Sequence, residues 1–328
     1  MHYALLFLCI LLIDARIVPL HNLDDQLRID DAVNDAIVPV NGAVIKSWDD
    51  WEDWSDSSVE TLEPGTSVCY PVVGCFDNNP PFDNAGLSVP QNPSLINTQF
   101  LLFTNSAPTN PEFLQYNQND SSIIKSRFSN SKWLRIIVHG FTNNRNSLWI
   151  PRLTEELLKL KDNEASDVLV VDWGNGAKFP LYNNAAANTR LVGKEIALLL
   201  KKMKTLKQLS YDKVHCIGLS IILFVFNIQL NNFSAARLGH SLGAHTCGYA
   251  SNEINHQMAR ISGLDPAGPF FEGKTAPVRL DQSDAKFIDV IHSNTEIALG
   301  VGLGSDDPSG HVDFYVNGGK QQPGCPSV

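Results

Sequence analysis

Positive charge is scarce in this sequence of 328 residues, which has 25 Lys and Arg against 35 Asp and Glu and a formal net charge of -10. A protein that binds nucleic acid needs a basic stripe to meet the phosphates, and we find none. The one lysine cluster is more simply the solvent-facing side of a helix; it comprises Lys201, Lys202, Lys204 and Lys207. We therefore expect no nucleic-acid partner.

Long apolar runs are absent too, since no segment reaches the roughly 20 residues that a transmembrane helix needs. "ALLFLCILLI" (Ala4–Ile13) has the length of the apolar centre of a signal peptide, although no Lys or Arg precedes it. We expect residues 1–15 to be a signal peptide. The mature protein is then expected to be secreted, soluble and without a transmembrane segment.

Cysteines are few, and one of the six lies in the expected signal peptide. In "VCYPVVGCF", Cys69 and Cys75 flank a Pro and a Gly, a spacing that can close a small disulfide ring of the kind common in secreted proteins. Cys216 stands in an apolar strand and Cys247 in an expected helix, so we expect both to be buried free thiols. Cys325 is left without an obvious partner.

The first part of the chain carries no helical or strand period. Residues 16–65 include "KSWDDWEDWSDSS", in which acidic residues alternate with tryptophans. We expect a flexible acidic leader, with a docking or pro-segment as the alternative. The remaining residues, 66–328, are expected to form one domain.

That domain alternates apolar strands with amphipathic helices. We expect strands at 99–104, 134–141, 167–173, 213–218, 259–265 and 287–293, and helices at 148–161 and 188–207. Continuous Val, Ile and Leu runs predict a mainly parallel central sheet with helices on both faces. Polar clusters follow several of these strands, at the edge where reacting groups gather in open α/β sheets.

One such cluster is the pentapeptide Gly239-His240-Ser241-Leu242-Gly243. Gly-x-Ser-x-Gly is typical of the nucleophile elbow of an α/β-hydrolase, where small residues permit a sharp turn from strand to helix. The pattern alone is moderately specific. The helix expected after it, "AHTCGYASNEI", would direct its N-terminus at Ser241 and favour developing negative charge.

Further residues are expected to complete a catalytic site around Ser241. Asp265 follows it by 24 residues, one helix plus one strand, and ends the strand "ARISGLD". We expect it to be the triad acid that orients a base; an ordinary turn aspartate is the alternative. The backbone N–H groups of Leu242 and of Phe141 in "HGF" are expected to form an oxyanion hole.

Together these motifs resemble the pancreatic lipase family, including its arthropod triacylglycerol lipase and phospholipase A1 members. The resemblance runs in order through 67–326 and rests on "VCYPVVGCF", "IIVHGFT", "VVDWGNGA", "GHSLGAH", "GLDPAGP", "VRLDQSDAKFIDVIHS" and "GHVDFYVNGGKQQPGC". It implies an α/β-hydrolase fold, a secreted enzyme and lipid-ester substrates at an interface, either triglyceride or phospholipid. It also implies Ser241 as nucleophile, Asp265 as acid and a Cys69–Cys75 disulfide.

The resemblance also implies that no cofactor is required for catalysis, whereas some relatives bind a structural calcium in the segment matching "APVRLDQSDA". The oxygen ligands would be the carboxylates of Asp281 and Asp284 and the backbone oxygens of Ala276 and Arg279. Two solvated loop aspartates are an equally good interpretation. His240 and His245 flank the elbow and are expected to pack and hydrogen-bond rather than act as the base.

The catalytic histidine of the family has no counterpart in this sequence. His292 and His311 are the histidines after Asp265, and both match family positions that are not the base. We therefore expect a fold incomplete at its C-terminus and an impaired enzyme. A non-catalytic, yolk-protein-like binder of lipid or a partner is the alternative, but the retained Ser241 and Asp265 favour an enzyme.

An anomalous insertion, residues 219–239, separates the strand "KVHCIG" from the elbow. Joining Gly218 to His240 gives "VHCIGHSLGAH", which matches the family without interruption. The insertion is rich in Ile, Leu, Phe and Asn, and its ends are compatible with splice-site codons. We interpret it as a hypothetical retained in-frame intron.

Overall fold

The computed structural model describes residues 62–219, 241–295, 303–320 and 322, all within a unit that spans Lys46–Val328. The expected signal peptide, nearly all of the acidic leader and Cys325 lie outside these residues. So do His240 and residues 220–239 of the insertion. A second unit, Met1–Ile45, is likewise not described.

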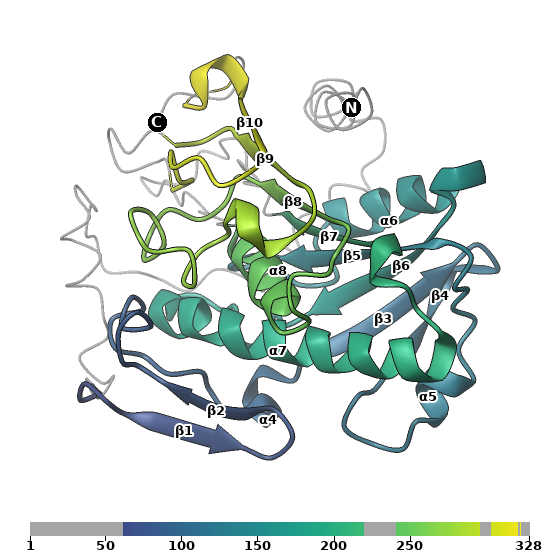
Figure 1. Cartoon of the computed structure of the whole chain (residues 1–328), viewed down its shortest axis with the longest axis horizontal. Helices are drawn as coiled ribbons and strands as arrows, with labels where there is room; N and C mark the ends of the chain where they lie inside the picture. The colour runs from purple at the N-terminus through teal and green to yellow at the C-terminus, as the bar shows by residue number, and fades with distance from the viewer. Residues whose placement is uncertain (1–61, 220–240, 296–302, 321, 323–328) are drawn as a thin grey trace, which may run out of the picture. The chain divides into compact units, whose positions relative to one another are not determined.

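The described residues form a large sheet whose strands lie in the order β10-β9-β8-β7-β5-β6-β3-β4 (Figure 1). In chain order the strands are β3 (Gln99–Thr104), β4 (Ala107–Leu114), β5 (Trp133–His139), β6 (Ser166–Asp172), β7 (Val214–Leu219), β8 (Arg260–Leu264), β9 (Ile288–His292) and β10 (Val312–Tyr315). The neighbours from β10 to β6 are parallel, and β3 is antiparallel to both β6 and β4. All six expected strands form, and the mainly parallel sheet is confirmed.

Helices cover both faces of this sheet. The chain steps from β5 through α6 (Trp149–Lys159) to β6, then through α7 (Tyr182–Lys207) back across β5 to β7. Because parallel crossovers are right-handed, steps in opposite directions place α6 and α7 on opposite faces. α8 (Leu242–Asn252), which leads from β7 to β8, packs beside α7 (Figure 1). The expectation of helices on both faces is confirmed.

Several elements escaped prediction. β1 (Ser67–Tyr70) and β2 (Gly74–Asp77) form a separate antiparallel hairpin. β4 contains two prolines, which a sheet tolerates at an edge, and β4 is an edge strand. The remaining short elements are α4 (Pro93–Ile96), α5 (Ser121–Ile124) and the 3₁₀ turns η1 (Asp162–Glu164), η2 (Tyr211–Lys213), η3 (Gln282–Asp284) and η4 (Val316–Gly318).

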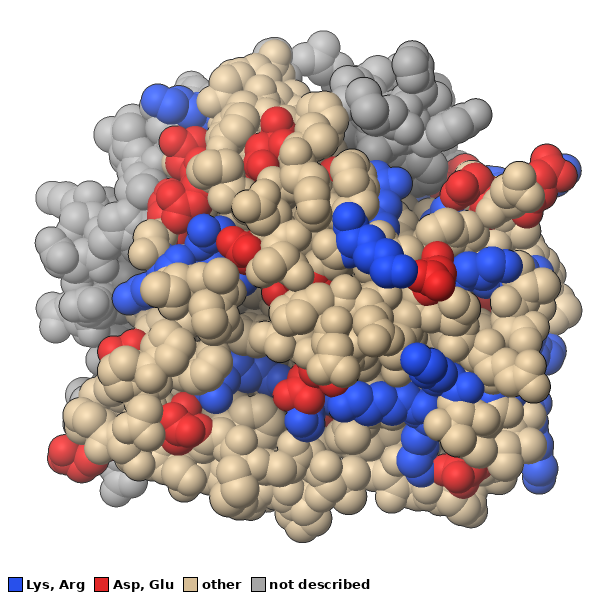
Figure 2. Space-filling view, in the orientation of Figure 1, with Lys and Arg blue, Asp and Glu red and all other residues tan. Residues whose placement is uncertain are grey.

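The lysine cluster lies at the C-terminal end of α7. Lys201 and Lys204 are exposed, and Lys202 pairs with Asp120, as expected for the solvent side of a helix. On the face shown in Figure 2, basic side chains over α7 are interspersed with acidic ones. No described helix is both long and apolar enough to cross a membrane.

Candidate active site

The residues expected to react gather at one edge of the sheet. β5, β7 and β8 are parallel neighbours, so their carboxyl ends lie side by side. Phe141 follows the end of β5 by two residues and Asp265 follows β8 directly. Ser241 pairs with Pro266 in an isolated parallel bridge, which places it next to Asp265 along this edge.

Ser241 is the N-cap residue of α8, just before the first helical residue. Its backbone has φ of -78° and ψ of 68°, the conformation of an inverse γ-turn, so the chain turns there without a left-handed residue. Its side chain is buried, with 1% of the residue exposed. Its Oγ has no hydrogen-bond partner among the described residues. The hydroxyl is thus held at the edge without being committed to another group.

The strand register shows how Ser241 relates to β7. Leu219 pairs with Leu264, and Ser241 pairs with Pro266, so the ladder leaves room for one residue between Leu219 and Ser241. The chain has residues 220–240 there, 21 in all, which is 20 more than the ladder accommodates. Leu219, which we counted as the first inserted residue, is the last residue of β7.

Two glycines let α8 approach the sheet closely. A Cβ atom on Gly243 would lie 2.2 Å from the carbonyl oxygen of Val138 in β5. A Cβ atom on Gly218 in β7 would lie 2.2 Å from the backbone nitrogen of Ala244. The first turn of α8 therefore rests on the ends of both strands. Leu242 is the first residue of α8, so its N–H has no acceptor within the helix.

The Asp265 carboxyl is held by the two residues that follow β9. Its Oδ1 accepts hydrogen bonds from the backbone N–H groups of Ser293 at 2.9 Å and Asn294 at 3.0 Å. Burial raises the pKa of Asp265, and hydrogen bonds from both backbones and from the Ser293 side chain oppose that rise. A carboxylate held in place by fixed hydrogen bonds suits the acid that orients a base.

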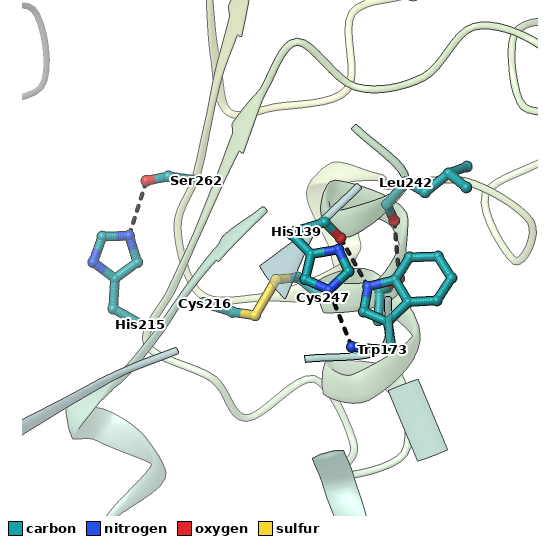
Figure 3. Close-up of a disulfide and its surroundings, with 8 residues drawn as sticks. His139, Trp173, His215, Cys216, Leu242, Cys247 and Ser262 are labelled. Carbon is teal, nitrogen blue, oxygen red and sulfur yellow. Dashed lines mark hydrogen bonds between the residues drawn. A yellow bond between two sulfur atoms is a disulfide. The ribbon is translucent and has the colours of Figure 1, made fainter. Parts of the chain in front are cut away.

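His139 fixes the loop that carries Phe141. Its Nε2 accepts the backbone N–H of Trp173 at 3.0 Å, so its Nδ1–H donates to the carbonyl of Gly140 at 3.0 Å. The Trp173 indole donates back to the His139 carbonyl at 2.8 Å, and the two rings stack (Figure 3). We did not predict this clamp, although "HGF" and "DWG" at the ends of two expected strands carried its signal.

An aromatic row extends from the same loop. Phe141 is buried and meets the ring of Tyr182 edge-on at 5.0 Å between centroids. Tyr182 in turn stacks on Phe270 at 5.6 Å. Phe179 and Leu181, just before α7, are large apolar residues that stay exposed. Apolar groups thus line one side of this edge of the sheet.

His245 has the packing and hydrogen-bonding role that we expected. Its Nδ1 accepts the backbone N–H of Leu280 at 2.9 Å, so its Nε2–H donates to the carbonyl of Ala267 at 2.9 Å. Its ring stacks on Phe271 at 3.9 Å. Burial lowers the pKa of His245 to about 4, which keeps the ring neutral at physiological pH. His245 thus joins α8 to the loops after β8.

The two histidines that follow Asp265 are engaged elsewhere. His292 is buried, with Nδ1 bonded to the Ser305 carbonyl at 2.7 Å and Nε2 to the Asp313 carboxylate at 2.9 Å. His311 accepts the N–H of Ile288 at the opposite end of β9 from the site. Neither is placed as the base for Ser241, in line with our expectation.

The segment expected to bind calcium forms a tight turn at η3. Asp284 Oδ2 accepts the N–H of Asp281, and Asp281 Oδ1 accepts the N–H of Ser283. Burial, aided by the charge of Asp281, raises the pKa of Asp284 to about 7. The structure thus brings together Asp281 and Asp284, with the Arg279 guanidinium 3.8 Å from Asp281. Ala276 lies in the exposed loop before them.

These residues fit a cation in part. The charge of Arg279 offsets only part of the effect of burial on the pKa of Asp284, and a bound ion would supply further positive charge. Two carboxylates are present, but no described group of three or more His, Cys, Asp and Glu side chains could hold a metal ion. Backbone oxygens, such as those of Ala276 and Arg279, would have to complete the coordination.

The structure contains two disulfides among the described cysteines. Cys69–Cys75 closes the β1–β2 hairpin and confirms the expected ring. Cys216 and Cys247 are also bonded, so the expectation of free thiols was wrong. Burial is the same for a thiol and a disulfide, and the sequence does not reveal that β7 and α8 pack with these two Cα atoms 5.8 Å apart.

This chain is similar to known lipases. The family model described as Lipase matches residues 66–228 and 222–328, and its two matches meet inside the inserted segment. The pancreatic triacylglycerol lipases of Oryctolagus cuniculus and Homo sapiens are each 36% identical to this chain over 80% of its length and 52% and 51% of their own. Pancreatic lipase-related protein 2 of Cavia porcellus is 36% identical over 79% of this chain and 55% of its own.

This chain thus spans about half the length of the curated relatives that it matches. The match nevertheless covers most of this chain and includes every strand of the sheet. The sheet, with helices on both faces and Gly-x-Ser-x-Gly at the start of α8, is an α/β-hydrolase fold. The chain belongs to the pancreatic lipase family.

Proposed function

We propose that this protein is a secreted serine hydrolase that cleaves lipid esters through an acyl-enzyme on Ser241. One observation carries the proposal: Ser241 and Asp265 lie at adjacent strand ends, where Ser241 Oγ has no described hydrogen-bond partner and the Asp265 carboxyl is fixed by two backbone N–H groups. A nucleophile needs an uncommitted hydroxyl, and the acid that orients its base needs a fixed carboxylate. The two disulfides suit an oxidising compartment and support secretion.

In this mechanism Ser241 Oγ attacks the ester carbonyl carbon and loses its proton to a base. The base then protonates the alcohol that leaves as the ester C–O bond breaks, and water hydrolyses the acyl-enzyme. The N–H groups of Leu242 and Phe141 receive the negative charge that develops on the carbonyl oxygen. Leu242 is suited to this because it begins α8, whose N-terminus favours negative charge. The His139–Trp173 clamp holds the other half of the oxyanion hole.

The base is the part of the triad that the described histidines do not supply. In the proposed triad, a histidine would donate its Nδ1–H to the Asp265 carboxylate and accept the Ser241 proton on Nε2, and the family's catalytic histidine has no counterpart in this sequence. A chain without that histidine would lose activity on the order of 10⁶-fold, because the serine would have no proton acceptor. This is the basis for expecting an impaired enzyme.

For the substrate, we propose a triglyceride or phospholipid at an interface. Partly exposed Phe270, backed by the buried rings of Tyr182 and Phe141, would offer an apolar wall to an acyl chain. Exposed Phe179 and Leu181 would extend this apolar surface to a lipid surface. No cofactor is required for the chemistry, and calcium at Asp281 and Asp284 would have a structural role.

The test is hydrolysis of three substrates by the chain and by Ser241→Ala. Emulsified triglyceride, phospholipid vesicles and a soluble short-chain ester separate the two lipid classes from simple esterase activity. Turnover abolished by Ser241→Ala supports the proposal. Turnover that persists unchanged in the variant contradicts Ser241 as nucleophile.

A second function follows from the missing base. If neither lipid nor ester is hydrolysed, the same apolar wall would serve a non-catalytic, yolk-protein-like binder of lipid or a partner. Vesicle binding that is equal in the wild-type chain and Ser241→Ala, without hydrolysis, is the result that favours it. Binding that depends on hydrolysis would exclude it.

A further inference from the structure

A disulfide joins the strand before the nucleophile to the helix after it. Cys216 lies in β7 and Cys247 in α8, their Cα atoms are 5.8 Å apart, and both residues are fully buried. Figure 3 shows the bond running between strand and helix, with the His139–Trp173 clamp in its surroundings. Cys216 and Gly218 share the face of β7 that meets α8, because side chains two residues apart in a strand point the same way.

An ordinary nucleophile elbow is positioned by the continuous chain that runs from its strand into its helix. Here residues 220–240 come between Leu219 and Ser241, which occupy places two apart in the ladder with β8. The chain that re-enters the sheet at Ser241 must therefore re-establish its strand register with the segment after β8. Closing a loop of this length costs conformational entropy that a direct connection does not cost.

The returning end of the chain is well buried, but in the described residues few polar contacts hold it to the sheet. The hydrogen bond from the Ala267 N–H to the Ser241 carbonyl is 3.4 Å long. His245 adds two bonds of 2.9 Å, but they tie α8 to the loops after β8 rather than to β7. Gly218 and Ala244 touch without a directional bond. The disulfide is the covalent link between β7 and α8 in the described part of the chain.

We propose that Cys216–Cys247 is a positioning pair for the nucleophile, which holds the first two turns of α8 on β7 across the insertion. The bond spans a sequence separation of 31 residues and so closes the whole interrupted segment. Neither cysteine touches substrate in this scheme. Their effect on the rate rests on the proposed function, whereas their effect on α8 does not.

The first experiment maps the bond in the purified, unreduced chain. Trypsin cuts after Lys213, Arg237 and Arg260, so the disulfide should join peptides 214–237 and 238–260. Finding the joined pair, released by a phosphine reductant, supports the proposal. Alkylation of both thiols without prior reduction would overturn it.

The second experiment removes the bond and reads the order of α8 by hydrogen exchange. In C216A/C247A the amides of residues 242–247 should exchange at least tenfold faster, while those of α6 stay unchanged. The matched control C69A/C75A removes the hairpin disulfide and should leave 242–247 within twofold of the wild-type chain. Unchanged exchange of 242–247 in C216A/C247A would overturn the proposal.

A deletion separates positioning from general stability. Removing residues 220–239 leaves His240 as the one residue between Leu219 and Ser241, as the ladder requires, and shortens the cysteine separation from 31 to 11. In this deletion background, C216A/C247A should change the amide exchange of residues 242–247 by less than threefold. In the full chain, C216A/C247A should lower kcat on a soluble ester about tenfold at similar KM. In the deletion background the same double variant should lower kcat less than threefold.

The outcomes are distinct. An equal effect of C216A/C247A in both backgrounds would show a merely structural disulfide and overturn the positioning role. If no variant hydrolyses ester, the proposed function fails, and the exchange data alone decide on positioning. If C216A/C247A does not fold in the full chain but folds after the deletion, the dependence on the insertion is confirmed.

Discussion

A Cβ atom on Gly218 would lie 2.2 Å from the backbone nitrogen of Ala244 and 2.4 Å from its Cα, which is closer than any real carbon contact. β7 and α8 therefore meet backbone to backbone at the point where the chain has left for residues 220–240 and come back. The glycine that the family pattern places before the nucleophile is Gly239 by sequence. By contact, Gly218 fills the role of a small residue beneath the helix.

Gly218→Ala should separate β7 from α8. The added methyl group meets backbone atoms, which cannot move aside as a flexible side chain can, so we expect a loss of roughly 3 kcal/mol in the free energy of unfolding. Urea denaturation measures it. Gly268→Ala is the milder control, because its nearest neighbour would be the Gly304 carbonyl oxygen at 3.2 Å. Equal stability of the two variants would contradict close backbone packing at Gly218.

Asp265→Asn should retain the fold and lose the activity. The amide oxygen can still accept the N–H groups of Ser293 and Asn294, whereas the amide NH₂ group cannot accept a hydrogen bond from the N–H of a histidine. We expect kcat to fall on the order of 10⁴-fold in a chain that has its base. Ester hydrolysis and circular dichroism together measure the effect.

Asp313→Asn is the matched control for that variant. Asp313 accepts from His292 and from the backbone of Ser309 and Gly310, away from the nucleophile. Its amide variant should cost stability with little loss of kcat. A similar loss of kcat in both variants would argue that Asp265 acts through the fold alone, as an ordinary turn aspartate would.

The six apolar strands were predictable because strands buried on both faces read as continuous apolar runs, as in "IIV" of β5 and "VLVV" of β6. The edge strands were not. β4 carries two prolines and several polar residues, because an edge pairs on one side only. β10 is a short strand at the other edge, half exposed, with no apolar run to reveal it.

In the site, the Gly-x-Ser-x-Gly pattern singled out Ser241, and the end of a predicted strand singled out Asp265. Such patterns could not locate the Cys216–Cys247 bond, since pairing depends on how a helix packs on a strand. The His139–Trp173 clamp was missed for the same reason: it joins the ends of β5 and β6, which are distant in sequence. Contacts between elements are decided by packing rather than by local pattern.

Asp284→Asn should stabilise the calcium-free protein at neutral pH. Burial raises the pKa of Asp284 from 3.8 to about 7, so the folded state holds a proton that the unfolded state has lost between those pH values. The stability contributed by this group is complete below pH 3.8 and is lost as the pH rises through 7. The variant should gain roughly 2–4 kcal/mol relative to the wild-type chain between pH 4 and pH 8, measured by urea denaturation.

Calcium provides the second arm of that measurement. A bound cation would favour the ionised carboxylate, so calcium should raise the melting temperature of the wild-type chain at pH 8 and leave Asp284→Asn nearly unchanged. Asp212→Asn, a fully exposed aspartate paired with Lys286, serves as the control and should respond to calcium as the wild-type chain does. If calcium has no effect on any of the three, the two aspartates are a capped turn and not a cation site.

The pH dependence of His245 has the opposite sign. Burial lowers its pKa from 6.5 to about 4, so between those values the unfolded state binds a proton that the folded state does not. Stability from this group is complete above pH 6.5 and is lost as the pH falls toward 4, by up to about 3 kcal/mol. His245→Gln removes the titration but also the stacking on Phe271. The variant should be less stable at pH 7, and its deficit should shrink at pH 4.5. A deficit that stays constant between those pH values would show that His245 is not held neutral by burial.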